Sequence, residues 1–307
     1  MTIDRDQPQT QQFQRQCAAL AERLQTLPDK PQETAAATLR ALWQLAAGRA
    51  MSIEAAELSA LPALDQAAQA RLADLISMRI SGVPLAHLTE RQRFMGMELL
   101  AGRGALIPRR ETELLGDAAL SVLRRLARER QGVVVIDVCT GSGNLALALA
   151  HHEPKAQVFA ADLSEDAVEL ARRNAAHARL SERVEVRLGD LLAPFDQAQF
   201  HGAVDLLVCN PPYISSQKVA VMASEISDFE PRLAFDGGPL GVRILQRLIR
   251  ESPRYLKPGG VLAFEVGHGQ GPAVLKRLQA QGNFGQPQTV TDAQGEIRAI
   301  LVECEPR

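Results

Sequence analysis

Apolar residues recur every three or four positions between Gln12 and Gly82, which is the spacing of one face of a helix. Pro28 and Pro62 mark two breaks in the pattern, and Gly82 followed by Pro84 ends it, as glycine and proline often do after a helix. The pattern predicts a bundle of short helices. Its apolar positions are Leu20, Leu24, Leu27, Leu39, Leu42, Leu45, Leu72, Leu75 and Ile76.

A short hairpin is predicted after this bundle. Arg93–Leu100 and Ala105–Ile107 have the composition of short strands, and Gly102-Arg103-Gly104 between them provides a turn. From Glu111 to Gln131 the apolar spacing is helical again, so we expect one long helix there.

Beyond Gln131, short apolar or β-branched runs alternate with helical stretches. This alternation is typical of a parallel sheet covered by helices on both faces. The expected parallel strands are Val133–Asp137, Val158–Asp162, Val184–Leu188, Val204–Cys209 and Val261–Val266. A terminal antiparallel hairpin is expected from Gln288–Asp292 and Ile297–Val302.

The composition is that of an ordinary globular protein, since 46% of the 307 residues are hydrophobic and 23% are charged. The longest apolar runs fall well short of the ~18 residues that a membrane-spanning helix needs. Residues Met1–Gln16 are polar and lack the apolar stretch of a secretory signal. We therefore expect a cytoplasmic protein without a membrane partner.

The formal net charge of −2 argues against broad binding to nucleic acids, and we expect no sequence-specific nucleic-acid partner. Residues 91–130 are an exception, because nine arginines outnumber five acidic residues there. This local excess has two interpretations. It is either a solvated helix face or a docking surface for an anionic partner.

The cysteines and histidines do not indicate a metal site. Cys17, Cys139, Cys209 and Cys304 match no CxxC pattern, and the six histidines lack metal-ligand spacing. We expect reduced thiols and no bound metal. Cys139 and Cys209 end strands that would be neighbours, so we expect them to lie close together and to fill space in the core.

A glycine-rich turn, Asp137-Val138-Cys139-Thr140-Gly141-Ser142-Gly143, follows the first parallel strand. Glycines let the backbone approach a ligand closely, and the helix expected from Asn144 offers unpaired N–H groups at its start. The turn is therefore a candidate cofactor loop. Gly141, Gly143 and Ala146 also fit a dinucleotide fingerprint, so the turn alone does not separate NAD from S-adenosylmethionine.

Two acidic residues follow the next two strands. Asp162 lies at the end of the second strand, where a carboxylate can accept hydrogen bonds from both ribose hydroxyls. Asp190 ends the third strand and could accept a hydrogen bond from an adenine amino group. The alternative is that both acids only cap helices.

The segment Asn210-Pro211-Pro212-Tyr213 favours S-adenosylmethionine over NAD as the cofactor. Two prolines make the turn stiff and remove two backbone donors. The Asn210 side-chain oxygen and the Pro211 carbonyl can together hold both hydrogens of an NH2 group, while Tyr213 stacks on a planar amide or base. The nitrogen lone pair then points at an electrophile, so positioning and electrostatics supply most of the catalysis. The alternative is a rigid turn without chemistry.

These segments resemble the class I S-adenosylmethionine-dependent methyltransferases that modify planar nitrogens. Further segments are similar to the HemK/PrmC-type protein-glutamine methyltransferases, which methylate the GGQ-loop glutamine of peptide chain release factors. The segments that carry this second resemblance are Pro84–Thr89, Phe94–Gly96, Leu106–Glu113, Glu230–Ala234, Gly237, Gly238, Gly241, Asp292 and Arg298.

The resemblance implies an α/β fold with three parts. A Rossmann-like, seven-stranded class I methyltransferase domain is expected over residues 111–307. A small helical domain over residues 1–84 would dock the substrate, and a β-hairpin linker would span residues 85–110. We expect a monomer.

The resemblance also implies roles for individual residues. The glycine loop would hold the methionine part of S-adenosylmethionine, and Asn210 would hold the substrate amide. The implied cofactor-binding residues are Asp137, Thr140, Gly141, Ser142, Gly143, Asp162, Leu163, Asp190, Leu191 and Asn210. The implied catalytic residues are Asn210, Pro211, Pro212 and Tyr213.

Three further residues are candidates for a role at the site. Glu111 and Thr112 could close over the cofactor, although the helix dipole equally explains a carboxylate at a helix start. Glu265 ends the fifth strand near the expected site and is a candidate functional carboxylate.

Three positions depart from the family pattern: Cys139, Arg110 and Leu240 replace the usual glycine, proline and aspartate. Cys-Thr-Gly-Ser-Gly is the form found in a sister family that acts on a ribosomal-protein glutamine. We expect methyl transfer to a glutamine amide of a translation protein, foremost a release factor. The alternatives are a ribosomal-protein glutamine, a small-molecule nitrogen or oxygen acceptor, a noncatalytic binding module and an NAD oxidoreductase.

Overall fold

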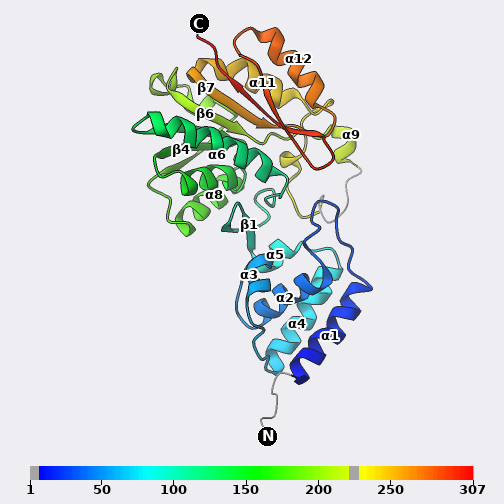
Figure 1. Cartoon of the computed structure of the whole chain (residues 1–307). Coiled ribbons are helices and arrows are strands. Elements are labelled where there is room, and N and C mark those ends of the chain that lie inside the picture. Colours follow the sequence, from blue (N-terminus) through cyan, green and yellow to red (C-terminus); the bar gives the residue numbers. More distant parts are fainter. Residues whose placement is uncertain (1–6, 221–227, 307) are drawn as a thin grey trace.

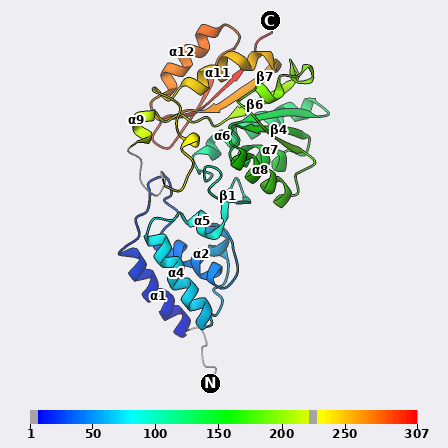
Figure 2. The same ribbon diagram turned by 180° about the vertical axis from the view of Figure 1, so that it is seen from behind.

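The structure, a computed structural model, describes residues 7–220 and 228–306. Figures 1 and 2 show an elongated molecule in which the helices near the N-terminus lie at one end. The sheet and its covering helices lie at the other end, and the short hairpin that contains β1 lies between them.

The N-terminal helices form a bundle, as the apolar spacing predicts. Side chains of Thr34, Ser52 and Asp65 each accept a hydrogen bond from the backbone three residues on, which starts the second, third and fourth helices. Trp43 is 1% exposed in the centre of the bundle, and its indole N–H donates to the Pro62 carbonyl at 2.8 Å. The helices are α1 (Gln7–Ala21), α2 (Ala35–Ala46), α3 (Ile53–Leu58), α4 (Gln66–Ile80) and α5 (Leu85–Thr89).

The hairpin of the linker differs from the prediction. Arg93–Leu100 is not one strand, because the chain turns inside it: β1 is Arg91–Phe94 and β2 is Met97–Leu100. Met95 and Gly96 between them both have positive φ, of 45° and 82°, which makes a two-residue turn. The expected strand at Ala105–Ile107 is wrong, since those residues form no strand.

The main sheet has seven strands in the order β5-β4-β3-β6-β7-β9-β8, which confirms the predicted α/β architecture. The first five of these are parallel, and the hairpin of β8 and β9 adds to β7 in antiparallel fashion. The strands are β3 (Val133–Val138), β4 (Ala156–Asp162), β5 (Val184–Leu188), β6 (Val204–Cys209), β7 (Leu256–Glu265), β8 (Gln288–Thr291) and β9 (Ile297–Glu303).

Strand β7 begins at Leu256, earlier than the predicted start at Val261. The pairing of β6 with β7 shifts register between Val204 and Leu206, so the strand continues through an irregularity near Pro258. Proline and glycine at this point hid the first half of the strand from the sequence pattern.

Helices cover both faces of the sheet. Alternate strand residues join the core beneath α6 (Thr112–Glu129), α7 (Asn144–His152) and α8 (Glu165–His177), and the others join the core beneath α11 (Arg243–Glu251) and α12 (Gly271–Gln281). Within residues 7–220 and 228–306, no helix has both the length and the apolar character needed to cross a bilayer. The remaining short helices are α9 (Ser216–Val219), η1 (Ala193–Phe195), η2 (Ala198–Phe200), η3 (Arg232–Ala234) and η4 (Ser252–Arg254).

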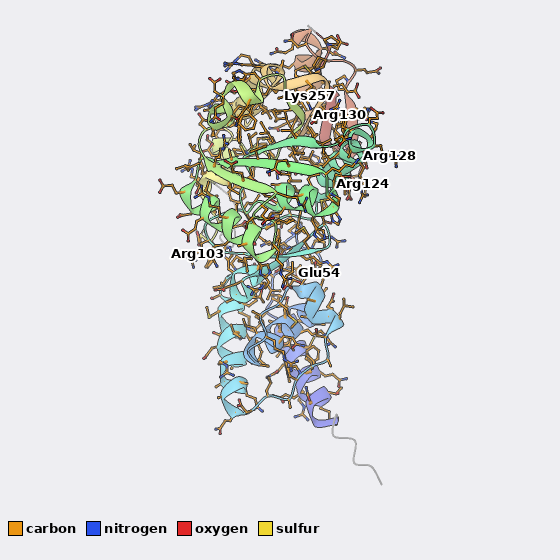
Figure 3. All side chains as sticks on the ribbon, turned by 90° about the vertical axis from the view of Figure 1, so that its left-hand side faces the viewer. Glu54, Arg103, Arg124, Arg128, Arg130 and Lys257 are labelled. Carbon is orange, nitrogen blue, oxygen red and sulfur yellow. The ribbon has the colours of Figure 1, made fainter. Side chains whose placement is uncertain are left out.

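The arginine-rich segment does not form a single surface. Arg130 is paired with the buried carboxylate of Asp205. Figure 3 shows Arg103 near the linker, well apart from Arg124 and Arg128 on the other side of the sheet region. This distribution favours the solvated helix face over one docking surface for an anionic partner.

A buried ion cluster joins the bundle, the linker and the sheet region. Arg109 of the linker bonds Glu230 at 2.6 Å and pairs with Asp29, in the α1–α2 connection, at 3.1 Å. The other oxygen of Glu230 accepts the Ile107 N–H at 2.8 Å. The Glu230 side chain is 0% exposed and that of Arg109 is 8% exposed. The cluster therefore fixes the linker above the sheet edge.

Replacement of Glu230 by glutamine should destabilise the protein by about 3 kcal/mol, because it leaves the buried Arg109 charge with only one carboxylate partner. Glu303→Gln is the matched control, since its pair with Arg125 is half-exposed and should contribute less than about 1 kcal/mol. Denaturant unfolding midpoints measure both variants. Equal shifts would show that the cluster does not stabilise the fold.

Candidate active site

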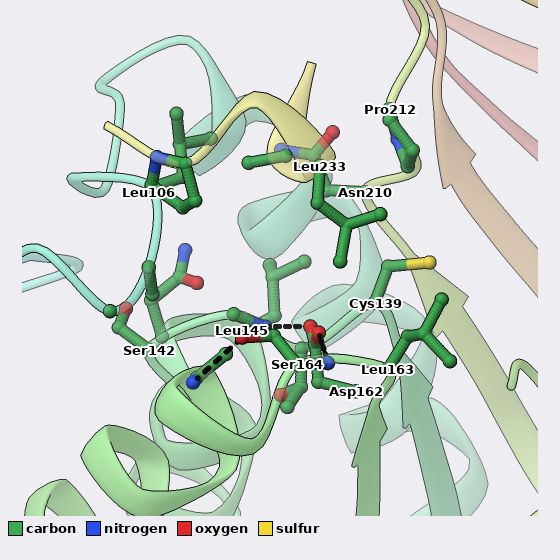
Figure 4. Close-up of a pocket in the computed structure, with 18 of the residues that line it drawn as sticks. Leu106, Cys139, Ser142, Leu145, Asp162, Leu163, Ser164, Asn210, Pro212 and Leu233 are labelled. Carbon is green, nitrogen blue, oxygen red and sulfur yellow. Dashed lines mark hydrogen bonds between the residues drawn. The ribbon is translucent and has the colours of Figure 1, made fainter. Parts of the chain in front are cut away.

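The candidate residues meet at the edge where the parallel strands end. The chain runs from β3 through β4 to β5 on one side of β3 and then crosses to β6 on the other side, which opens a crevice at the end of β3. The glycine loop follows β3, Asp162 ends β4, and Asn210 follows β6. A pocket lies over these three segments (Figure 4).

The glycine loop is held by Asp137 from below. Asp137 Oδ2 accepts the Thr140 hydroxyl at 2.5 Å and the Ala146 N–H at 3.2 Å, which ties the loop to the first turn of α7. Cys139 stands at φ 58°, in the left-handed region that glycine adopts most easily. Burial raises the pKa of Asp137 to about 7, and its Oδ1 has no hydrogen-bond partner in the described part of the chain.

Asp162 lies on the floor of the pocket. Its two oxygens accept the Gly141 N–H at 2.8 Å and the Ser164 N–H at 3.0 Å, as the dashed lines of Figure 4 show. Burial raises the pKa of Asp162, and these backbone hydrogen bonds oppose the shift. The carboxylate is thus fixed in place, with the neighbouring Leu163 at the rim.

Most of the predicted cofactor-binding residues line this pocket. Those that do are Thr140, Gly141, Ser142, Asp162, Leu163, Asp190, Leu191 and Asn210. Asp137 and Gly143 are not among its lining residues: Asp137 supports the loop, and Gly143 packs closely against Ala171 and Leu147. The Asp190 carboxylate is held by Arg247 at 2.9 Å, a partner that the sequence did not reveal.

Two segments far apart in the chain cover the pocket. Leu106 belongs to the linker and Leu233 to the segment that begins at Glu230, and Figure 4 shows both across the pocket from Asp162. Neither residue was a predicted site residue. Both segments carry motifs similar to those of the protein-glutamine methyltransferases, but the spacing of apolar residues did not predict that the two segments cover one pocket.

A second pocket adjoins the first at Asn210. Pro211, Tyr213, Glu111 and Glu265 line the second pocket, whereas Pro212 lines the first. Asn210 and Thr112 line both. The predicted catalytic residues are therefore brought together at the boundary between two cavities.

Glycines back the Asn210–Tyr213 corner. A Cβ atom on Gly237 would overlap the Pro212 carbonyl oxygen, and one on Gly241 would overlap that of Tyr213. Gln270 adds a hydrogen bond to the Tyr213 carbonyl at 3.0 Å. Backbone of Gly237 and Gly241 therefore packs against the corner from behind, and the Gln270 side chain adds one hydrogen bond.

Acidic groups surround the far wall of the second pocket. The Tyr213 hydroxyl donates to Glu265 Oε1 at 2.9 Å, and Arg298 Nη2 lies 3.2 Å from Glu111 Oε1. Burial raises the pKa of Glu265 to about 7 and the pKa of Tyr213 well above its ordinary value. Tyr213 therefore stays protonated at neutral pH.

The four cysteines are free thiols. Cys139 and Cys209 are in contact, as their predicted strand positions suggested, and burial raises the pKa of the Cys209 thiol. A buried, protonated thiol is a poor nucleophile, which supports a packing role.

Comparison with protein families places residues 129–296 in a family described as "Methyltransferase domain". Among solved structures, a human methyltransferase 10 domain containing protein is similar with a TM-score of 0.50 at 17% identity. The match covers 68% of this chain and 89% of that one. The similarity to this solved structure shows a shared fold.

Relatives of known name match most of the chain. Release factor glutamine methyltransferase of Moorella thermoacetica is 37% identical over 78% of this chain and 81% of its own length. Its counterpart in Mycolicibacterium smegmatis is 35% identical over 86% of this chain and 90% of its own.

The glycine backing of the corner can be tested by substitution. Gly241→Ala should cost roughly 1–3 kcal/mol more than Gly202→Ala, because only the first places a methyl group against the Tyr213 carbonyl. Gly202 is the matched control, since its φ of 63° is equally left-handed but its Cβ would face open space. Equal losses of unfolding free energy would rule out a tight backing.

Proposed function

The chain belongs to the release factor glutamine methyltransferase family, and on this premise we propose that it methylates the GGQ-loop glutamine of peptide chain release factors. The methyl donor is S-adenosylmethionine, and the acceptor atom is the side-chain amide nitrogen. The observation that carries the proposal is the position of Asn210, which lines both the pocket over the glycine loop and the second pocket that adjoins it.

The first pocket fits the cofactor. Ser142 lines it, and the buried Ser142 Oγ lacks a hydrogen-bond partner within the described ranges, as expected where a polar ligand belongs. Asp162 would accept the ribose hydroxyls, and Asp190 with Leu191 would border the adenine. When bound there, S-adenosylmethionine supplies an electrophilic methyl group on a sulfonium centre.

Asn210 and Pro211 prepare the acceptor nitrogen. An amide nitrogen is a poor nucleophile because its lone pair is delocalised into the carbonyl group. Asn210 Oδ1 and the Pro211 carbonyl would accept its two hydrogens and turn the lone pair toward the first pocket. No strong base is needed beforehand, because the nitrogen becomes acidic once it is alkylated. Orientation in a dry, polar site supplies the rate enhancement.

The second pocket opens where the helical bundle meets the sheet region, since Asp29 and Arg109 both line it. A protein loop inserted there would contact both parts of the molecule. We therefore assign the bundle a docking role for the release factor, in a complex of one enzyme with one acceptor.

Incubation of the enzyme with a release factor and methyl-labelled S-adenosylmethionine should place label on the GGQ glutamine, detected by mass spectrometry of the digested acceptor. A release factor with that glutamine replaced should take up no label. Label that persists on the replaced acceptor, or that appears instead on a ribosomal-protein glutamine offered in parallel, would contradict the proposal.

Asn210→Ala should lower kcat by at least about 100-fold, because the acceptor loses one of its two positioning oxygens. Affinity for S-adenosylmethionine, measured by calorimetry, should change less than about threefold, since Asp162 and the glycine loop are intact. Asn283→Ala, near the C-terminal strand, is the matched control. An Asn210 variant with normal turnover would leave the corner as a purely structural turn.

A further inference from the structure

Asn210 is fixed in one orientation by Thr112. An amide side chain has a donor end and an acceptor end, and only Oδ1 can accept hydrogens from a substrate. The Asn210 nitrogen donates to Thr112 Oγ1 at 3.1 Å. Thr112 is 1% exposed, which limits the access of water to its end of this bond. The bond therefore turns Oδ1 away from Thr112, and half a turn of the amide would break it.

The Glu265 carboxylate lies next to Thr112. Cys209 pairs with Phe264 between β6 and β7, so Asn210 and Glu265 are the next residues along the same sheet edge. Glu265 is 1% exposed and Thr112 lies close enough to lower its pKa. The two residues, one from α6 and one from β7, thus meet beside Asn210.

Hydrogen-bond accounting indicates the direction of the Thr112 hydroxyl. Glu265 Oε1 accepts the Tyr213 hydroxyl at 2.9 Å, whereas Oε2 is buried and has no partner among the residues that the structure describes. An unmet buried acceptor is costly. Thr112 accepts from Asn210 and still has its own hydrogen to donate, and Glu265 Oε2 is the buried acceptor that needs one.

We propose that Glu265 is a positioning residue for methyl transfer: through the Thr112 hydroxyl, its carboxylate holds Asn210 with Oδ1 toward the acceptor amide. The inference rests on the proposed function and adds a residue to it. In the series Asn210, Thr112, Glu265 each hydrogen bond polarises the next, so a negative charge on the accepting Glu265 carboxylate strengthens the whole series. No covalent bond forms or breaks in this step.

Ionisation of Glu265 should therefore control the rate. Burial raises the pKa of Glu265 to about 7, and Glu111 raises it further, while contacts with Thr112, Tyr213 and Arg298 oppose the shift. Glu111 precedes α6, Tyr213 follows β6 and Arg298 belongs to β9. A protonated Glu265 can itself donate a hydrogen bond to the Thr112 hydroxyl, which reverses the direction of the hydrogen bond between these two residues. Turnover should fall as the pH drops through about 7.

The test is a pH profile of kcat and KM with the release factor as acceptor. Thr112→Val keeps the shape of the side chain without its hydroxyl and should lower kcat roughly 10- to 100-fold, with cofactor affinity unchanged. Thr112→Ser should restore kcat to within about threefold. Glu265→Gln should lower kcat and remove the decline below about pH 7. Thr289→Val, on the exposed strand β8, is the control.

A Thr112→Val enzyme with wild-type kcat, or a Glu265→Gln enzyme that retains the acidic decline, would overturn the inference. Wild-type enzyme that transfers no methyl group to the release factor would instead contradict the proposed function. Infrared titration of isotope-labelled Glu265 separates the two, because it needs no turnover. Loss of the Thr112 hydroxyl should raise the pKa of Glu265, and an unchanged pKa would also overturn the inference.

Discussion

The edge at which the parallel strands end is the constraint on which the site depends. Side chains that follow β3, β4, β6 and β7 must lie near one another, because parallel strands bring their carboxyl ends to the same side of the sheet. Asp162 and Asn210 therefore share one pocket although they are far apart in sequence. Pairing of Cys209 with Phe264 extends the same logic to Asn210 and Glu265.

Rigidity at this edge comes from backbone contacts. Gly237 and Gly241 leave no room for a side chain between their own backbone and the carbonyls of Pro212 and Tyr213. Two prolines limit the corner further. An amide acceptor reacts only when its hydrogens are held out of the way, so a corner that does not yield serves the proposed chemistry better than flexible side chains would.

The apolar runs of the sequence were sufficient to predict the sheet, and residues with recognisable chemistry at the ends of several strands, such as Asp162 and Asn210, indicated most of the lining of the first pocket. The turn at Met95-Gly96 was missed, since Met95 is not a residue that usually adopts positive φ. The sequence did not predict the pairing of Arg247 with Asp190 or the position of Leu106 over the pocket. Both are contacts between segments far apart in the chain, and hydrophobic periodicity predicts only local structure. The domain limits and the individual site roles remain proposals from the resemblance.

A crystal structure with S-adenosylhomocysteine and a peptide containing the GGQ sequence would test the central claim most directly. The account predicts the ribose at Asp162, and the glutamine NH2 within hydrogen-bond distance of both Asn210 Oδ1 and the Pro211 carbonyl. An acceptor amide that sits outside the second pocket, or an Asn210 amide that turns its nitrogen toward the substrate, would contradict it.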